Sequence, residues 1–328
     1  MINLPKLMLG GDLPQLVRIA TAIADDYSPT VECNAEHLVT AEPVALCLLA
    51  ASFGQLERRG QCARIRGLRP EVRQNLERLD VLADWFRERP LQTPDFQSDD
   101  RQSDLRACRV STLGQANQIA NALSREIAAF IPSDDLDAVI DDDPTLVRYR
   151  VVEQPLEYLI TELLDNSLKH GRVGGFGNAT AWVAAQYYRV GDLLRVAVVD
   201  DGCGFLRSLE SHPEVTPSTH QNAISTAFRP FVSCNKDVGV FSDTTHQGIG
   251  LTVCRDLCLR ADGDISAASG TAWLSSPATS SETSRMLAPG YQGVVVMMTL
   301  HRRAITPGSL GEIIRRYQSN ENLPVRLI

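Results

Sequence analysis

The sequence predicts an α/β protein built from two domains. Its 328 residues exceed what one core usually organises, because chains of this length divide into units of about 100 to 200 residues. Segments with strand and helix periodicity alternate within the first 90 residues, and a long amphipathic helix and a buried strand follow in the second half. Between the halves lies a stretch rich in Pro, Gln, Ser and Asp.

The first half contains a strand, helix, strand, helix order. A short apolar segment at Leu38-Val39 precedes a helix over residues 44–57, in which leucines and Phe53 recur at helical spacing. Residues 62–66 alternate like a strand. A second helix begins at Pro70, a favoured first-turn residue, and runs towards Trp85.

This order resembles the STAS domain, the fold of anti-sigma-factor antagonists. In phosphorylatable STAS domains a Ser or Thr stands at the start of the helix after the first core strand. Residues 40–45 (TAEPVA) place no hydroxyl at that position. The resemblance therefore implies a STAS-like regulatory or docking domain over residues 1–90, rather than a phosphoacceptor.

The domain boundaries follow from composition. Residues 91–109 are expected to be a linker, because their polar composition cannot bury enough apolar surface for a core. An amphipathic helix is predicted over residues 111–130, ending before Pro132, and an acidic loop follows at 134–143. The second domain is expected over residues 110–305 and a C-terminal tail over 306–328.

The helix predicted over residues 154–170 carries the strongest chemical signal. Glu162 and Asn166 are four residues apart and project from one face. A carboxylate there can act as a general base, and an amide oxygen can ligate Mg²⁺, a hard ion that takes oxygen ligands. The alternative is an ordinary amphipathic helix, in which Lys169 and His170 complement the helix dipole.

A buried strand over residues 193–200 runs into an Asp-x-Gly-x-Gly turn. The Asp200 carboxylate can accept a hydrogen bond from an exocyclic amine such as that of adenine, and Gly202 and Gly204 allow close approach of the backbone to a ligand. A Rossmann motif is disfavoured because the aspartate precedes the glycines and a third glycine is missing. A plain Asp-Gly turn remains the alternative.

Residues 246–251 (HQGIGL) are a glycine-rich turn in front of a helix predicted over 252–260. Free backbone N–H groups at a helix start attract anions, so a triphosphate fits there. The preceding segment 227–231 (AFRPF) is expected to be an aromatic anchor. Residues 232–245 are expected to be a lid over the nucleotide.

In order and spacing these motifs resemble the GHKL superfamily of histidine kinases, anti-sigma kinases, gyrase-type ATPases and related chaperones. The resemblance runs from about residue 115 to 302 and implies a two-layer α/β sandwich that binds ATP and Mg²⁺. It implies that Glu162 is the catalytic base, Asn166 the Mg²⁺ ligand and Asp200 the adenine-reading carboxylate. The other implied nucleotide contacts are Lys169, His170, Gly202, Gly204, Gly248, Ile249, Gly250 and Leu251.

The last predicted strand departs from the family pattern. Val294 follows Gly293 where many relatives carry Thr, so a hydroxyl that would assist adenine recognition through water is missing. Residues 275–289, rich in Ser and Thr, are expected to form a surface loop between strands.

Composition excludes several classes of function. The formal charge of −8 argues against a general nucleic-acid binder, which needs a basic face. No apolar run reaches the roughly 20 residues that cross a bilayer, and the N-terminus lacks a signal-peptide pattern, so a cytoplasmic protein is expected. The 8 cysteines are scattered without a zinc-type cluster and are expected to be reduced, mostly buried thiols.

Fold does not settle function, and several hypotheses remain. The favoured one is a Ser/Thr protein kinase or anti-sigma-type switch that acts in signal transduction on a regulatory or phosphoacceptor protein. A histidine kinase acting in cis would need a phosphoacceptor histidine in the helix over 111–130, which has none. An ATP-gated ATPase switch, a catalytic module acting in trans and a non-hydrolysing ATP-binding module are the alternatives, and a homodimer stays open.

Overall fold

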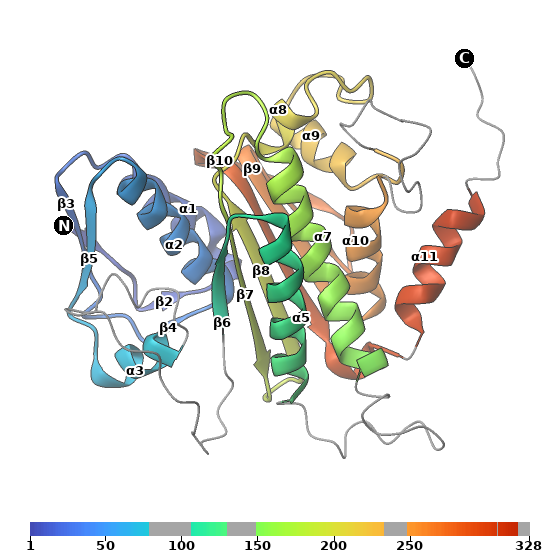
Figure 1. Cartoon of the computed structure of the whole chain (residues 1–328), viewed down its shortest axis with the longest axis horizontal. Helices are drawn as coiled ribbons and strands as arrows, with labels where there is room; N and C mark the ends of the chain where they lie inside the picture. The colour runs from blue at the N-terminus through green and yellow to red at the C-terminus, as the bar shows by residue number, and fades with distance from the viewer. Residues whose placement is uncertain (79–105, 130–148, 233–247, 307, 321–328) are drawn as a thin grey trace.

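The computed structural model describes residues 1–78, 106–129, 149–232, 248–306 and 308–320. Helices and strands are mixed throughout, so the predicted α/β class is confirmed. A five-stranded sheet forms the centre, with helices of the second half on one face and helices of the first half on the other (Figure 1).

The central sheet has the order β6-β7-β8-β10-β9, and its neighbouring strands are antiparallel. Within it, β8 pairs with β7 and β10, and Asp200 at its end lies opposite Val294. The sheet therefore brings the beginning of the predicted glycine turn beside Val294, in the second half of the last strand. Its strands are β6 Arg106–Val110, β7 Ala181–Tyr188, β8 Leu193–Asp200, β9 Asp264–Pro277 and β10 Thr283–His301.

Helices α5 (Leu113–Ala129), α7 (Gln154–His170) and α10 (Gly250–Arg260) share a core with one face of this sheet. Because side chains alternate along a strand, Val183 of β7 faces this core whereas Trp182 and Ala184 face the opposite side. Both faces of β7 and β8 are thus buried. This double burial explains the nearly continuous apolar run of β8.

The N-terminal unit covers the other face of the sheet with α1 (Leu13–Ala24) and α2 (Pro43–Arg58). Helix α2 approaches β7 closely: a Cβ atom at Gly54 would lie 2.7 Å from Cζ2 of Trp182. The N-terminal unit and the central sheet therefore share one hydrophobic core.

The unit has two small parallel sheets of its own. In the first, β3 (Thr30–Asn34) lies between β1 (Ile2–Asn3) and β5 (Cys62–Arg66). In the second, β2 (Leu7–Met8) pairs with β4 (Thr40–Ala41), and helix α3 (Pro70–Arg78) follows β5. The predicted order strand, helix, strand, helix is present as β4, α2, β5 and α3. Helix α1 and strand β3 were not anticipated.

Three expected boundaries differ from the structure. The linker over 91–109 overlaps β6, because residues 106–109 pair with β7. The tail over 306–328 contains helix α11 (Ser309–Asn320), whose Leu310 and Ile313 are buried in the core. The expected loop over 275–289 is instead mostly strand, since β9 ends at Pro277, β10 begins at Thr283, and residues 283–286 pair with 272–275. The acidic loop 134–143 and most of the expected lid, residues 233–245, lie outside the described residues.

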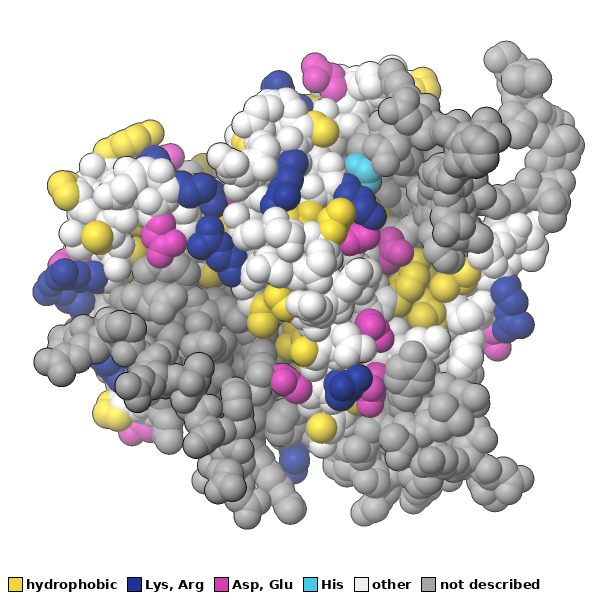
Figure 2. Space-filling view, in the orientation of Figure 1, with side chains coloured by type: hydrophobic (Ala, Val, Ile, Leu, Met, Phe, Trp, Pro, Cys, Tyr) yellow, Lys and Arg dark blue, Asp and Glu magenta, His cyan; other side chains and the backbone are white. Residues whose placement is uncertain are grey.

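The described surface mixes charges of both signs. On the face in Figure 2, basic and acidic side chains are interspersed and do not gather into one patch of a single sign. Among the described helices, none has the length and apolar character needed to cross a membrane. The described cysteines are free thiols, and Cys254 and Cys258 are buried in the core.

Candidate functional site

Helix α7 and the start of α10 meet at Glu162 and Gly250. A Cβ atom at Gly250 would lie 2.0 Å from Oε2 of Glu162, so a side chain there would force this carboxylate to move. The predicted catalytic base therefore lies at the N-terminus of α10, where free backbone N–H groups and the helix dipole attract anions.

The Asp200 carboxylate is buried at the end of β8. Its Oδ1 accepts hydrogen bonds from the backbone N–H groups of Gly202 (2.9 Å) and Val294 (3.2 Å). Burial raises the pKa of Asp200 to about 7, against the lowering effect of the Gly202, Val294 and Ser167 hydrogen bonds. The side chain is thus held in one orientation by donors from three elements.

Around Asp200, backbone segments pack so closely that the positions of Gly202 and Gly293 leave no room for a Cβ atom. A Cβ atom at Gly202 would lie 2.4 Å from the Gly171 carbonyl oxygen, and one at Gly293 would lie 1.9 Å from that of Asp200. Gly204 has a φ of +77°, in the left-handed region that favours glycine, and opens the short helix α8 (Gly204–Ser208). Gly202 and Gly204 therefore shape the turn by close backbone packing.

The second glycine turn also requires its glycines. Gly248 has a φ of +82° and lies against the backbone of Phe231 and Val232. Ile249 is buried, and its carbonyl oxygen accepts the hydrogen bond of Val253 N–H. Leu251 is half-buried and packs against the core. Ile249 and Leu251 thus anchor the start of α10, while Gly248 joins it to the aromatic segment.

Three predicted residues follow Glu162 on the same face of α7, towards the C-terminus of the helix. Asn166 is half-buried, one turn beyond Glu162. Lys169 is exposed and forms an ion pair of 2.6 Å with Asp165. His170 is half-buried, and burial together with the Lys169 ammonium lowers its pKa. The Lys169–Asp165 pair is an ordinary ion pair on the helix surface. Lys169 therefore has a structural contact in addition to the nucleotide contact predicted for it.

The environment of Glu162 favours its protonated form. Burial raises the pKa of Glu162, the Asp165 carboxylate adds to the increase, and the Lys169 ammonium opposes it. A carboxylate with a raised pKa is a stronger base near neutral pH than an exposed glutamate. Glu162 and Asn166 also offer the oxygen donors that Mg²⁺ prefers, which fits the expected ion. No group of three or more metal-ligating His, Cys, Asp or Glu side chains occurs in the described part of the chain.

Comparison with known proteins gives the family of this region. Residues 151–303 match the family described as "Histidine kinase-, DNA gyrase B-, and HSP90-like ATPase". They form a GHKL-type ATPase domain. The matched region begins three residues before α7 and ends two residues after β10, and so contains both glycine turns. No curated protein matches the chain, and no family model matches the N-terminal unit, so its STAS resemblance stays a prediction.

Some residues of the ATPase domain's candidate site escaped sequence reasoning. Ser167 hydrogen-bonds to Asp200 from within α7, next to Asn166. Gly171 accepts a hydrogen bond of 2.8 Å from Cys203 N–H and thereby ties the end of α7 to the glycine turn. Ser167 follows Asn166 in the sequence, and Gly171 follows His170. Their small side chains next to predicted site residues were the only indication in the sequence that the backbone or a neighbouring group packs closely there.

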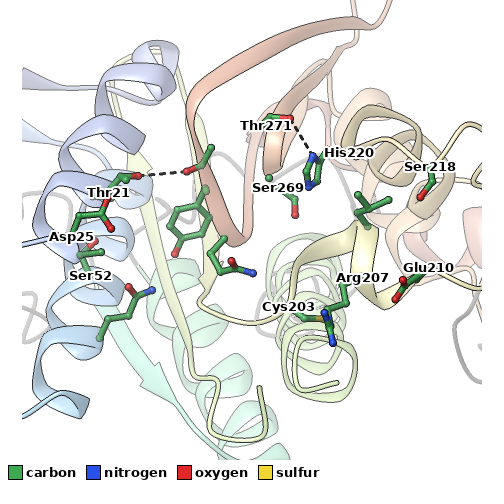
Figure 3. A pocket seen from close by; sticks show the side chains of 18 residues that line it. Thr21, Asp25, Ser52, Cys203, Arg207, Glu210, Ser218, His220, Ser269 and Thr271 are labelled. Carbon is green, nitrogen blue, oxygen red and sulfur yellow. Dashed lines mark hydrogen bonds between the residues drawn. The ribbon is translucent and has the colours of Figure 1, made fainter. Parts of the chain in front are cut away.

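A separate cavity lies between the N-terminal unit and the ATPase domain. It has a volume of about 630 Å³ and does not include Glu162, Asn166 or Asp200. Helices α1 and α2 form one wall, and α8 with α9 (His220–Ala227) forms the other (Figure 3). On the α1 side, the Thr21 hydroxyl donates to the Gly290 carbonyl oxygen of β10 (3.5 Å). The cavity therefore lacks the candidate base and the adenine-reading carboxylate but borders the first glycine turn at Cys203.

Proposed function

We propose that this chain binds ATP with Mg²⁺ in its ATPase domain and acts in signal transduction by transferring the terminal phosphoryl group to a hydroxyl of a partner protein. One observation carries the proposal: the Glu162 carboxylate lies against Gly250 at the N-terminus of α10. This arrangement puts a candidate base next to a candidate phosphate-binding helix start within a domain of ATPase type.

The candidate nucleotide contacts divide by chemistry. Asp200 would accept the hydrogen bond of the adenine amine, because its carboxylate is buried and fixed by backbone donors. The N–H groups around Gly248 and Gly250 would bind phosphate oxygens. Asn166 would hold Mg²⁺, which supplies neutralisation of phosphate charge when bound. Lys169 and His170 are assigned phosphate or ribose contacts at the edge of this site.

Glu162 would accept the proton of the attacking hydroxyl. Its raised pKa makes it a stronger base than an exposed glutamate, and its place against Gly250 would orient the nucleophile towards the phosphate end of the site. The same residue would activate water in an ATPase, so the carboxylate alone does not choose between kinase and ATPase chemistry.

The N-terminal unit would select the partner as a STAS-like regulatory module. Support comes from its strand and helix order and from its packing on the ATPase domain. That packing also favours a second candidate, an ATP-gated switch, because nucleotide-dependent movement of the sheet would reach the unit directly. Since α5 contains no histidine, a histidine kinase that phosphorylates this helix in cis is disfavoured.

The test combines binding with label transfer. Titration calorimetry with MgATP on the wild type and on Asp200→Asn tests the nucleotide site. ATP labelled on the γ-phosphate shows where the phosphoryl group goes, and Glu162→Ala is the control for the chemical step. Label on a protein hydroxyl supports the kinase, whereas release as free phosphate supports the switch. Wild-type protein that binds no adenine nucleotide would refute the proposal.

A further inference from the structure

An arginine of the N-terminal unit reaches the glycine turn of the ATPase domain. Arg58, at the end of α2, forms an ion pair with Oδ2 of Asp201, the residue between Asp200 and Gly202. The Asp201 side chain is 1% exposed and that of Arg58 is 32% exposed. The pair is thus closed to water on the aspartate side and open on the arginine side.

Asp201 is also fixed from the ATPase domain itself. Its Oδ1 accepts a hydrogen bond of 2.8 Å from Thr180 N–H, and its own N–H donates to the Thr180 carbonyl oxygen at 3.3 Å. The two carboxylate oxygens therefore have different partners, one on each side of the interface. Loss of Arg58 would leave Oδ2 buried without the cation that its charge requires.

The turn has little freedom to absorb a shift of Asp201. Asp200 on one side is held by two backbone N–H groups, and Gly202 on the other side lies against the Gly171 backbone. Closely packed interiors transmit such displacements to their neighbours. A change in the Arg58 contact is therefore passed to the Asp200 carboxylate.

The charge of Arg58 also links it to Asp200. Asp200 and Asp201 are adjacent buried carboxylates, and each burial raises the pKa of the group concerned. The Asp201 charge raises the pKa of Asp200 further, whereas Arg58 lowers the pKa of Asp201. Arg58 thus offsets the negative charge beside the carboxylate that would read adenine.

We propose that Arg58 is a positioning residue through which the N-terminal unit sets the nucleotide affinity of the ATPase domain. The inference rests on the proposed function, because it assumes that Asp200 contacts the nucleotide. It adds to that function a route by which any partner that moves α2 changes ATP binding.

The chain offers a matched control at the other end of the same strand. Arg195, near the start of β8, forms an ion pair with Glu42 at the start of α2. This pair joins the same two parts of the molecule, and its arginine is 31% exposed, as against 32% for Arg58. Arg195 is five residues from Asp200, which is roughly 16 Å along the strand.

The experiment measures MgATP affinity by titration calorimetry and the melting temperature without nucleotide. We expect Arg58→Ala to weaken MgATP binding about tenfold, equivalent to about 1.4 kcal/mol, and Arg58→Lys to restore most of it. Arg195→Ala should lower the melting temperature about as much as Arg58→Ala does, but should leave the Kd for MgATP within about twofold of the wild-type value. In a double-mutant cycle, Arg58→Ala should have little further effect on Asp201→Asn.

Several outcomes would overturn the inference. Wild-type affinity in Arg58→Ala, or equal weakening by Arg195→Ala, would show that the Arg58 contact has no specific role in nucleotide binding. If Arg58→Ala does not fold, Arg58→Gln against Arg58→Lys gives the same contrast between a neutral and a charged donor. A wild type that fails to bind MgATP would remove the proposed function itself, which a change confined to Arg58 variants would not.

Discussion

The carboxylate of Glu162 occupies the space into which a side chain at Gly250 would project, with 2.0 Å between Oε2 and the place of a Cβ atom. Gly250→Ala should therefore displace Glu162 and reduce turnover by more than about tenfold, because catalytic groups depend on accurate placement. Adenine binding should change less, since Asp200 lies at the end of β8 and contacts α7 at Ser167, more than one helical turn beyond Glu162. Steady-state kinetics together with MgATP titration would separate the two effects.

Gly114→Ala is the control for this substitution. Gly114 also lies in the first turn of a helix, α5, but a Cβ atom added there would have no neighbour within 4 Å. Alanine there should stabilise the protein by about 0.5–1 kcal/mol and leave turnover unchanged. Equal rates for Gly250→Ala and the wild type would refute the role given to the Glu162–Gly250 contact.

Asp200→Asn should stabilise the empty protein at pH 8 while it weakens nucleotide binding. The folded pKa of about 7 lies above the ordinary 3.8, so the folded state holds the proton more tightly than the unfolded chain. Stability of the wild type therefore falls as the pH rises from about 4 to above 7. Asparagine carries no charge, and its oxygen can still accept from Gly202 and Val294 N–H.

Melting curves at pH 5 and pH 8 would test this expectation. The stabilisation by Asp200→Asn should be large at pH 8 and should shrink at pH 5, where the native wild-type carboxyl is already protonated. MgATP binding to the variant should be at least about tenfold weaker, because a hydrogen bond to a charged group contributes about 1.5–3 kcal/mol. A lower melting temperature for the variant at both pH values would contradict the prediction.

Glu162→Gln should abolish most turnover and retain MgATP binding. Loss of a general base typically costs about 10²- to 10⁴-fold in rate. Because burial raises the pKa of Glu162, the wild-type rate should fall on the acid side at a pH above 4.5, the ordinary value. A pH–rate profile of the wild type would locate this limb, and a Gln variant with full activity would exclude Glu162 as the base.

Gly54→Ala should destabilise the whole molecule. The added methyl would lie 2.7 Å from the Trp182 ring, and overpacking of a core costs about 1–3 kcal/mol. Because α2 and the central sheet share a core, we expect one cooperative unfolding transition that moves as a unit. Gly311→Ala in α11, with no atom within 4 Å of the added Cβ, is the control and should not destabilise the protein. Two separate transitions, with only one shifted, would contradict a shared core.

Much of the ATPase domain could be predicted because its signals are local. The apolar run of β8, the four-residue spacing of Glu162 and Asn166, and the glycines of both turns all depend on neighbouring residues. The structure adds a nonlocal reason for two of these glycines, since Gly202 packs on Gly171 and Gly250 on Glu162.

The interface with the N-terminal unit could not be predicted in the same way. In the sequence, Arg58 reads as a basic residue that complements the C-terminus of its helix. Its actual partner, Asp201, is 143 residues away and is found only when α2 packs on the sheet. Strand β6 was missed for a related reason, because a five-residue edge strand next to a polar stretch carries too little periodicity to be distinguished from a linker.

The double burial of the central sheet also has a consequence for synthesis on the ribosome. Helix α2 ends at residue 58, whereas β8, against which it packs, ends at residue 200. At about 5–20 residues per second, the apolar face of α2 waits roughly 7–28 s for that strand to be translated. During this interval the buried side chains of α2, Leu49 and Phe53 among them, have only the N-terminal part of their core. The nascent N-terminal unit should therefore bind chaperones, and slow translation of residues 59–200 should lengthen its exposure to aggregation.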